Sequence, residues 1–256
     1  MASMREKIGD IPVRIEMPAR ISGPLVLWMP HLSGSAEKEQ PMLDRFAELG
    51  HPAVSFDPVL HGERGDGSDR WAFALSVLGA FRARMWPIVG QTVLDAMAVL
   101  DWAADAIGIG EGVLAGGVSM GGDVAVALAG VDPRSRRVAA LGSTPDWTRP
   151  DMRSLTDPDM VIDQGEASVL GQWFCDQFNP AGHLDRYRRG VPMLFELGSA
   201  DFHIPAAHAA AFRHDLLALD QAAGDAIQIS VRDGLDHAGI TASDAALDSA
   251  VRFLCE

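Results

Sequence analysis

The most informative stretch of this chain is Gly117-Val118-Ser119-Met120-Gly121. It follows a run of small apolar residues over 112–116 and leads into a second apolar run over 122–129. That order predicts a buried strand, a sharp turn and a helix, with the serine hydroxyl pushed out of the sheet. The glycines are needed because strand and helix backbones pass there too closely for a Cβ atom. A G-x-S-x-G match also arises by chance in glycine-rich turns, so the prediction depends on its context.

The composition is that of a globular protein. Of the 256 residues, 48% are hydrophobic and 22% are charged, which are ordinary values for a folded domain. The formal net charge of -14 argues against binding to nucleic acid or to anionic membranes, because both need a basic face. No apolar run reaches membrane-spanning length, and no secretory signal is visible. Cys175 and Cys255 lie far apart and form no disulfide framework, so we expect a cytoplasmic protein.

Short apolar runs alternate with amphipathic stretches along the chain, the pattern of a parallel sheet covered by helices. Besides the strand before Ser119, the sequence predicts an edge strand at 11–16 and further strands at 24–29, 53–56, 137–142, 192–197 and 226–231. Besides the helix after Ser119, it predicts helices at 37–49, 89–106, 205–219 and 243–254. We therefore predict an α/β fold over residues 1–256 as a single domain, with a mostly parallel central sheet and helices on both faces.

Two connections, 62–87 and 143–190, are too long to be simple loops. Both leave the carboxyl ends of strands, where open α/β sheets bind their ligands. The second contains a helical patch at 167–178 and is predicted to be a small helical lid. Its many Asp, Pro and Arg residues favour a compact pocket, with walls from the aromatic side chains of Trp147, Trp173, Phe174 and Phe178. The core of the lid is an equally good place for Trp147, Trp173 and Phe174.

A serine hydroxyl is a poor nucleophile until a neighbouring base takes its proton, and that base is usually a histidine oriented by a carboxylate. On a sheet of this order, both partners are expected after later strands. Asp201 follows the strand at 192–197, and His237 follows the last strand. Asp146, which follows the strand at 137–142, is the alternative carboxylate.

These motifs together resemble the α/β-hydrolase family, from Pro24 onward. The matching pieces are G-V-S-M-G-G at 117–122, G-S-A-D-F-H-I-P at 198–205 and D-H-A-G at 236–239. The H-G-x-R ending at 61–64 is closer to dienelactone-hydrolase and prolyl-oligopeptidase-like esterases than to lipases. The resemblance implies that Ser119 is the nucleophile, His237 the general base and acid, and Asp201 the carboxylate that orients it.

An oxyanion hole needs backbone N–H groups that face the developing negative charge. The resemblance places one donor at Met120 and the other in the turn after the strand at 24–29. Aligned on residues 33–35, the family's His-Gly pair falls on Pro30-His31, and Leu32 becomes the donor. His31 replaces a glycine of the family, so Ser33 stays open as the alternative donor.

Four further residues are candidates for substrate binding: His31, His203, Trp147 and Trp173. His203 lies close to Asp201, and the two tryptophans lie in the predicted lid. His61 and Arg64 are expected to hold their own loop. A metal site from His203 and His208 lacks any recognised ligand spacing, so we expect no metal and no cofactor.

The first-choice function is hydrolysis of a carboxylic ester of a small substrate through an acyl-enzyme intermediate. A C–C bond hydrolase or an acyltransferase uses the same three residues and is the alternative among enzymes. A non-catalytic binding protein on the same scaffold is the alternative of another class, although such proteins normally lack one of the three residues. The sequence leaves the oligomeric state open.

Overall fold

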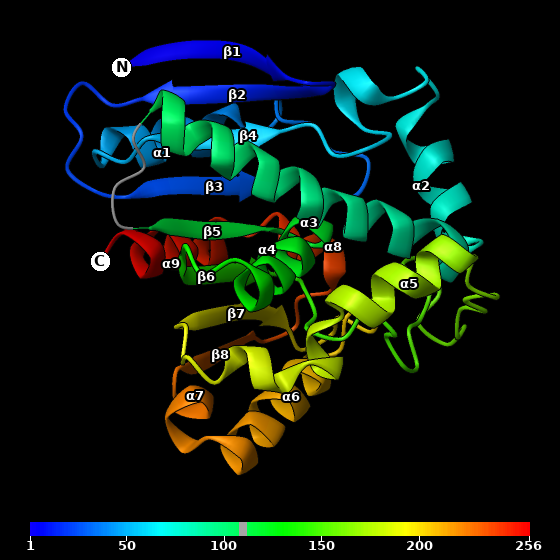
Figure 1. Cartoon of the computed structure of the whole chain (residues 1–256). Coiled ribbons are helices and arrows are strands. Elements are labelled where there is room, and N and C mark those ends of the chain that lie inside the picture. The colour runs from blue at the N-terminus through cyan, green and yellow to red at the C-terminus, as the bar shows by residue number, and fades with distance from the viewer. Residues whose placement is uncertain (108–111) are drawn as a thin grey trace.

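The computed structural model describes residues 1–107 and 112–256, and its described strands form one sheet in the order β1-β2-β4-β3-β5-β6-β7-β8 (Figure 1). β1 pairs with β2, and β2 with β4, in antiparallel fashion, whereas every pair from β4 to β8 is parallel. The strands are β1 Ala2–Ile8, β2 Ile11–Met17, β3 Leu25–Met29, β4 Ala53–Phe56, β5 Val113–Val118, β6 Ser135–Leu141, β7 Met193–Gly198 and β8 Ile227–Arg232. The predicted α/β class with a mostly parallel sheet is confirmed.

Helices cover both faces of the sheet, with α3 and α4 on one face and α1 and α9 on the other (Figure 1). The helices are α1 Gln40–Glu48, α2 Arg70–Leu78, α3 Phe81–Ala106, α4 Met120–Val131, α5 Val169–Phe178, α6 Ala206–Leu219, α7 Gln221–Asp225, α8 His237–Thr241 and α9 Asp244–Cys255. In the described residues, no single helix is long and apolar enough to cross a membrane. The pair α2 and α3, bent by 113° at the break between them, meets that test only by length and composition.

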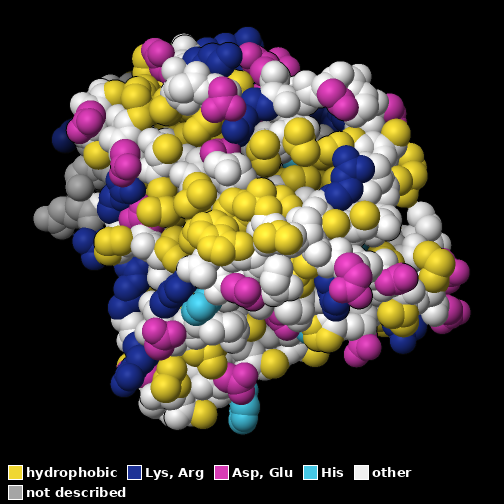
Figure 2. Space-filling view, turned by 45° about the vertical axis from the view of Figure 1, so that its right-hand side comes forward, with side chains coloured by type: hydrophobic (Ala, Val, Ile, Leu, Met, Phe, Trp, Pro, Cys, Tyr) yellow, Lys and Arg dark blue, Asp and Glu magenta, His cyan; other side chains and the backbone are white. Residues whose placement is uncertain are grey.

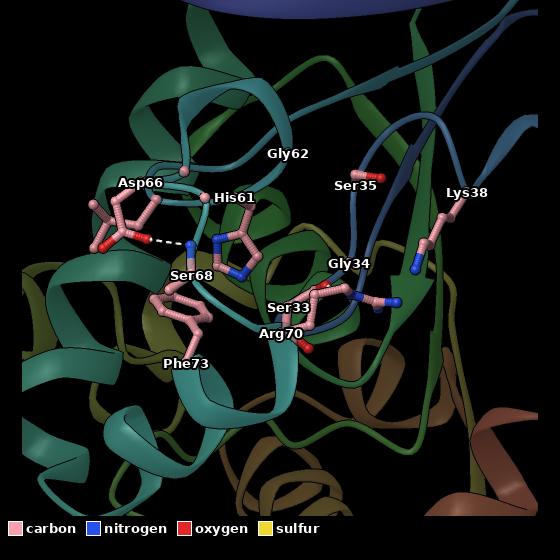
Figure 3. Close-up of a pocket in the computed structure, with 13 residues that line it drawn as sticks. Ser33, Gly34, Ser35, Lys38, His61, Gly62, Asp66, Ser68, Arg70 and Phe73 are labelled. Atoms are coloured by element: carbon pink, nitrogen blue, oxygen red, sulfur yellow. Dashed lines mark hydrogen bonds between the residues drawn. The ribbon is translucent and has the colours of Figure 1, made fainter.

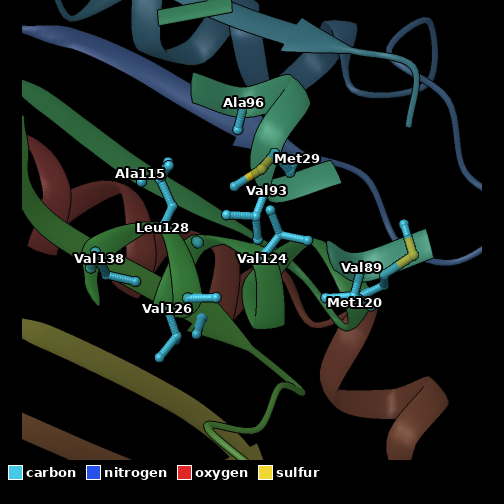
Figure 4. Packing of buried hydrophobic residues seen from close by; sticks show 14 of the residues in the cluster. Met29, Val89, Val93, Ala96, Ala115, Met120, Val124, Val126, Leu128 and Val138 are labelled. Atoms are coloured by element: carbon cyan, nitrogen blue, oxygen red, sulfur yellow. The ribbon is translucent and has the colours of Figure 1, made fainter. Parts of the chain in front are cut away.

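Side chains of each strand alternate between the two faces, which places a separate apolar core on each side. Along β3, Leu27 packs in the core under α3 and α4, whereas Trp28 packs in the core under α1 and α9. Figure 4 shows Val93 of α3 and Val124 of α4 packed against β5. α4 is buried almost all round, which holds its first turn, and Ser119 before it, in one position.

Two sequence predictions about this framework were wrong. The edge strand is β1, which pairs outside β2 and is exposed along almost its whole length, so it has no apolar alternation to detect. α3 begins at Phe81 rather than near 89, and Pro87 lies inside it. A proline early in a helix removes one backbone hydrogen bond, and the burial of Phe81, Met85 and Trp86 outweighs that loss.

The insertion between β6 and β7 is anchored to the core by its aromatic residues. A Cβ atom at Gly90 of α3 would lie 2.2 Å from the Phe174 ring, so α5 packs closely on α3 at this glycine. Trp147 is 2% exposed, its backbone N–H donates to Asn179 Oδ1 (2.9 Å), and its backbone carbonyl accepts from Trp86 Nε1 (2.8 Å). Trp147 and Phe174 therefore hold the insertion in place rather than forming a pocket wall.

Candidate active site

Ser119 stands at the turn between β5 and α4 with φ 51° and ψ -118°, a conformation that L residues rarely adopt. Cβ atoms at Gly117 and Gly121 would lie 2.5 Å and 2.1 Å from the carbonyl oxygen of Met29, so neither position accepts a side chain. Such backbone strain costs about 1–3 kcal/mol, which the surrounding structure must offset. The Ser143 hydroxyl, which donates to the Ser119 carbonyl at 2.8 Å, is one of the contacts that hold the turn.

The structure brings Ser119, His237 and Asp201 into one hydrogen-bonded chain. Ser119 Oγ lies 3.1 Å from His237 Nε2, and His237 Nδ1 lies 2.8 Å from Asp201 Oδ2. Because an ionised carboxylate only accepts hydrogen bonds, Nδ1 carries the proton and Nε2 is left free to accept from the serine. The other oxygen of Asp201 accepts from the N–H groups of His203 (3.0 Å) and Ile204 (2.8 Å), which fixes the carboxylate.

Asp146, the alternative carboxylate, serves its own turn instead. Its Oδ1 accepts from the N–H (2.9 Å) and the hydroxyl (2.7 Å) of Thr148. The carboxylate in contact with His237 is that of Asp201. The geometry therefore favours Asp201 over Asp146 as the orienting group.

Backbone donors for an oxyanion lie at two places around Ser119. Met120 is the first residue of α4, so its N–H has no acceptor within the helix and lies at the positive end of the helix dipole. Leu32 and Ser33 both line the cavity at Ser119, and Ser33 has φ 62°. Both residues therefore keep their place as candidates for the second donor.

Asp57, to which the sequence analysis gave no role, holds the turn after β3. Its two carboxylate oxygens accept from the N–H groups of Ala36 (2.8 Å) and Glu63 (2.8 Å), so it ties the turn after β3 to the turn after β4. Arg70 adds a second link, because its Nε donates to the Ser33 carbonyl (2.5 Å). The position of Asp57 directly after a buried strand was the available signal.

A cavity of about 900 Å³ opens over Ser119. Its walls come from the turn after β3, from α2 and α3, from residues 149–158 of the insertion, from the loop after β7 and from α8. His31 and His203 are among the lining residues.

Trp147 and Trp173 do not line this cavity, which corrects their assignment as substrate-binding residues. Trp147 is in the core, and Trp173 is 48% exposed on α5. The helical spacing of α5 turns Phe174 and Cys175 inward, which leaves Trp173 outward. Figure 2 shows the molecule with the side of α2 and α5 turned toward the viewer. Hydrophobic side chains gather across the middle of this face.

Uncharged imidazoles surround His237. Burial, followed by the nearby Arg149 and His237, lowers the pKa of His203 well below its ordinary value. The Nδ1 atom of His203 donates to the Arg153 carbonyl (2.9 Å), and its Nε2 faces Arg149 at 3.4 Å. Burial, followed by Arg70, also lowers the pKa of His31. Both rings are therefore neutral at pH 7, which leaves His237 as the imidazole in contact with the serine.

Arg149 is a second residue that sequence reasoning missed. Its guanidinium lines the cavity, pairs with Asp123 and lies over the Phe81 ring at 5.1 Å. Burial raises the pKa of Asp123, and Arg149 opposes that shift by favouring the carboxylate. Asp123 is an acidic residue in the otherwise apolar run of α4, and this was the available signal for a buried partner.

A smaller pocket of about 200 Å³ lies beside the cavity and shares Ser33 with it (Figure 3). Lys38, Arg70 and the His61 ring border it, and the Ser68 N–H donates to Asp66 (2.9 Å). His61 Nδ1 contacts the Val59 carbonyl (2.8 Å), and burial lowers the pKa of His61 to about 4. His61 therefore holds its own loop. The residues described include no group of three His, Cys, Asp or Glu side chains placed to bind a metal.

No protein-family model matches this sequence, and no curated protein matches it. Solved structures do match. TT1662 from Thermus thermophilus has a TM-score of 0.71 at 22% identity, over 99% of this chain and 96% of that one. A Klebsiella pneumoniae protein provisionally assigned as a dienelactone hydrolase has a TM-score of 0.68 at 19% identity, over 98% and 95%. Esterase 2 of Thermogutta terrifontis, phosphorylated by paraoxon, has a TM-score of 0.63 at 14% identity, over 98% and 90%.

This similarity extends over nearly the whole length of each chain at low sequence identity, so it defines the fold. The protein has the α/β-hydrolase fold, and the resemblance predicted from its motifs is confirmed at that level. The esterase and dienelactone-hydrolase names belong to the similar proteins, because one fold supports many chemistries.

Proposed function

We propose that this protein is a serine hydrolase that cleaves a carboxylic ester of a small substrate through an acyl-enzyme intermediate. The observation that supports this most is the hydrogen-bonded chain from Ser119 through His237 to Asp201 at the wall of a large cavity. In this proposal residues 1–256 act as one domain, and residues 143–190 form its lid. The proposed location is cytoplasmic, in keeping with two free cysteines. The proposed reaction uses side chains, backbone N–H groups and water, without a cofactor.

In the first step, Ser119 Oγ attacks the ester carbonyl while His237 Nε2 takes the serine proton. The N–H of Met120, together with that of Leu32 or Ser33, stabilises the negative oxygen of the tetrahedral intermediate. His237 then gives the proton to the leaving alkoxide, which departs as an alcohol and leaves the acyl group on Ser119. Asp201 stabilises the imidazolium that forms in between.

In the second step, water replaces the alcohol. His237 takes a proton from the water as it attacks the acyl carbonyl, and returns that proton to Ser119 Oγ when the acid leaves.

The names of two similar structures support ester chemistry on this scaffold. One is provisionally a dienelactone hydrolase, and the other is an esterase phosphorylated by paraoxon.

A fluorophosphonate probe tests the proposal, because it reacts with an activated serine. We expect labelling and hydrolysis of p-nitrophenyl acetate in the wild type, and loss of both in Ser119→Ala. Ser154→Ala is the matched control, since Ser154 also lines the cavity but lies outside the hydrogen-bonded chain. Labelling that survives in Ser119→Ala would contradict the proposal.

The same experiment separates the alternatives. A chain that neither reacts with the probe nor hydrolyses any ester is a binding protein. Labelling at Ser119 without ester hydrolysis, even across lactones and thioesters, favours a C–C bond hydrolase or an acyltransferase.

A further inference from the structure

We propose that the substrate of this site carries a bulky apolar acyl group, and that this group binds between α2 and the segment formed by Leu155, Pro158 and Phe202. This inference rests on the proposed ester hydrolysis and adds the class of substrate. It replaces the compact acyl pocket predicted from the sequence, whose aromatic walls lie outside the cavity.

The first observation is a set of large apolar side chains left in solvent around one cavity. Trp71 is 54% exposed, Phe202 is 49% exposed and Leu155 is 42% exposed. They come from α2, from the loop after β7 and from the insertion, yet all three line the cavity over Ser119. Single exposed apolar residues are normal on a protein surface, but several of them around one concave site mark a place for an apolar ligand.

The second observation is that the residues of α2 and α3 that line this cavity are all apolar. Ala74 and Leu78 follow Trp71 at helical spacing on the face of α2 that meets the cavity, and Met85 of α3 continues that wall. Ala74 and Met85 are buried, whereas Trp71 is half exposed, so the apolar surface runs from the interior to the mouth. A ligand that lies along this wall would remove it from water.

The third observation assigns this wall to the acyl side of the ester. His237 must give its proton to the leaving alcohol, so the alcohol portion lies beside His237. The part of the cavity wall that α8 and the residue after it contribute beside His237 is made of short side chains, Ala238, Thr241 and Ala242. The large apolar side chains of α2 and of the insertion belong to the remaining wall, where the acyl portion extends.

Size supports the same assignment. A cavity of about 900 Å³ is at the upper end of those that hold drug-sized ligands, and an acetyl group would leave most of it filled with water. Trp71 and Phe202 offer aromatic rings, which stack favourably on another ring. The expected acyl groups are therefore aromatic or otherwise bulky, such as a phenylacetyl or phenylpropionyl group.

The test compares p-nitrophenyl acetate with p-nitrophenyl phenylacetate and p-nitrophenyl 3-phenylpropionate. The kcat/KM of each ester is divided by the rate constant for hydrolysis of the same ester by hydroxide, which removes differences in intrinsic reactivity. We expect the bulky acyl esters to exceed the acetate by about 10-fold or more, the range that pocket contacts of this kind supply. Enlarging the alcohol instead, from p-nitrophenyl acetate to 2-naphthyl acetate, should change the normalised value less than about 3-fold.

Two variants connect the preference to this wall. In Trp71→Ala and in Phe202→Ala, the ratio of phenylacetate to acetate kcat/KM should fall about 10-fold. Trp173→Ala is the matched control, because Trp173 is an aromatic residue of similar exposure outside the cavity, and its ratio should equal that of the wild type.

Three outcomes would overturn the inference: an acetate that is hydrolysed as well as the bulky esters, a preference that follows the alcohol, or a ratio unchanged in both wall variants. Each of them leaves the proposed function intact if p-nitrophenyl acetate is still hydrolysed at Ser119. Loss of all ester hydrolysis, with no probe labelling at Ser119, would overturn both.

Discussion

The guanidinium of Arg149 pairs with the carboxylate of Asp123, and each side chain is only 2% exposed. Asp123 lies in the first turn of α4, directly after Ser119, whereas Arg149 belongs to the insertion. Arg149 also faces His203, whose backbone N–H holds Asp201. One buried ion pair therefore joins α4, the insertion and the loop after β7 that carries Asp201.

Removing one member of this pair should destabilise the protein strongly. Arg149→Met leaves the Asp123 carboxylate buried without its cation, a situation that costs about 3–5 kcal/mol. Urea unfolding measures the loss in the free energy of unfolding. Arg45→Met is the control, since the pair between Arg45 and Asp248 is exposed and should contribute less than about 1 kcal/mol. Equal losses in the two variants would contradict the assigned role of Arg149.

Ser119 and His237 should act as one catalytic unit. Ser119→Ala and His237→Ala are each expected to abolish most turnover, and the double variant should be hardly worse, because the first loss already removes the shared step. Steady-state kinetics with p-nitrophenyl acetate measure the three values. Losses that add in the double variant would show that the two residues act independently.

Asp201 should be essential for turnover and Asp146 should not. Asp201→Asn replaces the acceptor at His237 Nδ1 by a group that favours the wrong imidazole tautomer, a change that costs about 10⁴ in kcat in the well-studied serine proteases. Asp146→Asn keeps the size of a side chain whose acceptor oxygen serves Thr148 and Asn179 rather than His237. If kcat falls in Asp146→Asn and holds in Asp201→Asn, the orienting acid has been misassigned.

Glu39 should make stability depend on pH. Burial raises the pKa of Glu39 from its ordinary value of 4.5 to about 7, and the hydrogen bond from Trp28 Nε1 (2.9 Å) opposes that rise. Between these two values the folded state holds a proton that the unfolded state has released. The free energy of unfolding therefore falls as the pH rises from 4.5 to about 7, and this contribution levels off above it.

Glu39→Gln keeps the shape of the side chain and removes its titration. We expect the difference in unfolding free energy between wild type and Glu39→Gln to change by about 3 kcal/mol across this window, with the wild type losing stability toward high pH. Urea unfolding at several pH values measures it. Parallel curves for the two proteins would rule out a buried, protonated Glu39.

Local patterns were enough to predict most of the sheet and the turn at Ser119. Buried parallel strands are continuous apolar runs, and the turn at Ser119 needs glycine on both sides whatever surrounds it, so each leaves its signal within a few residues. β1 left no such signal, because an exposed edge strand needs no apolar face. α3 was predicted too short, because Pro87 is a local breaker whose cost is offset by distant packing partners.

The sequence by itself thus determined the fold class and the turn at Ser119, and its motifs pointed to Asp201 and His237. Only the tertiary structure decided that Trp147 and Phe174 anchor the insertion, that Arg149 pairs with Asp123, and that Trp71 and Phe202 line one cavity. The physical reason is that burial, ion pairing and the shape of a cavity depend on contacts between segments far apart in the chain. An aromatic or basic residue looks the same in the sequence whether it lies in a core or in a binding site.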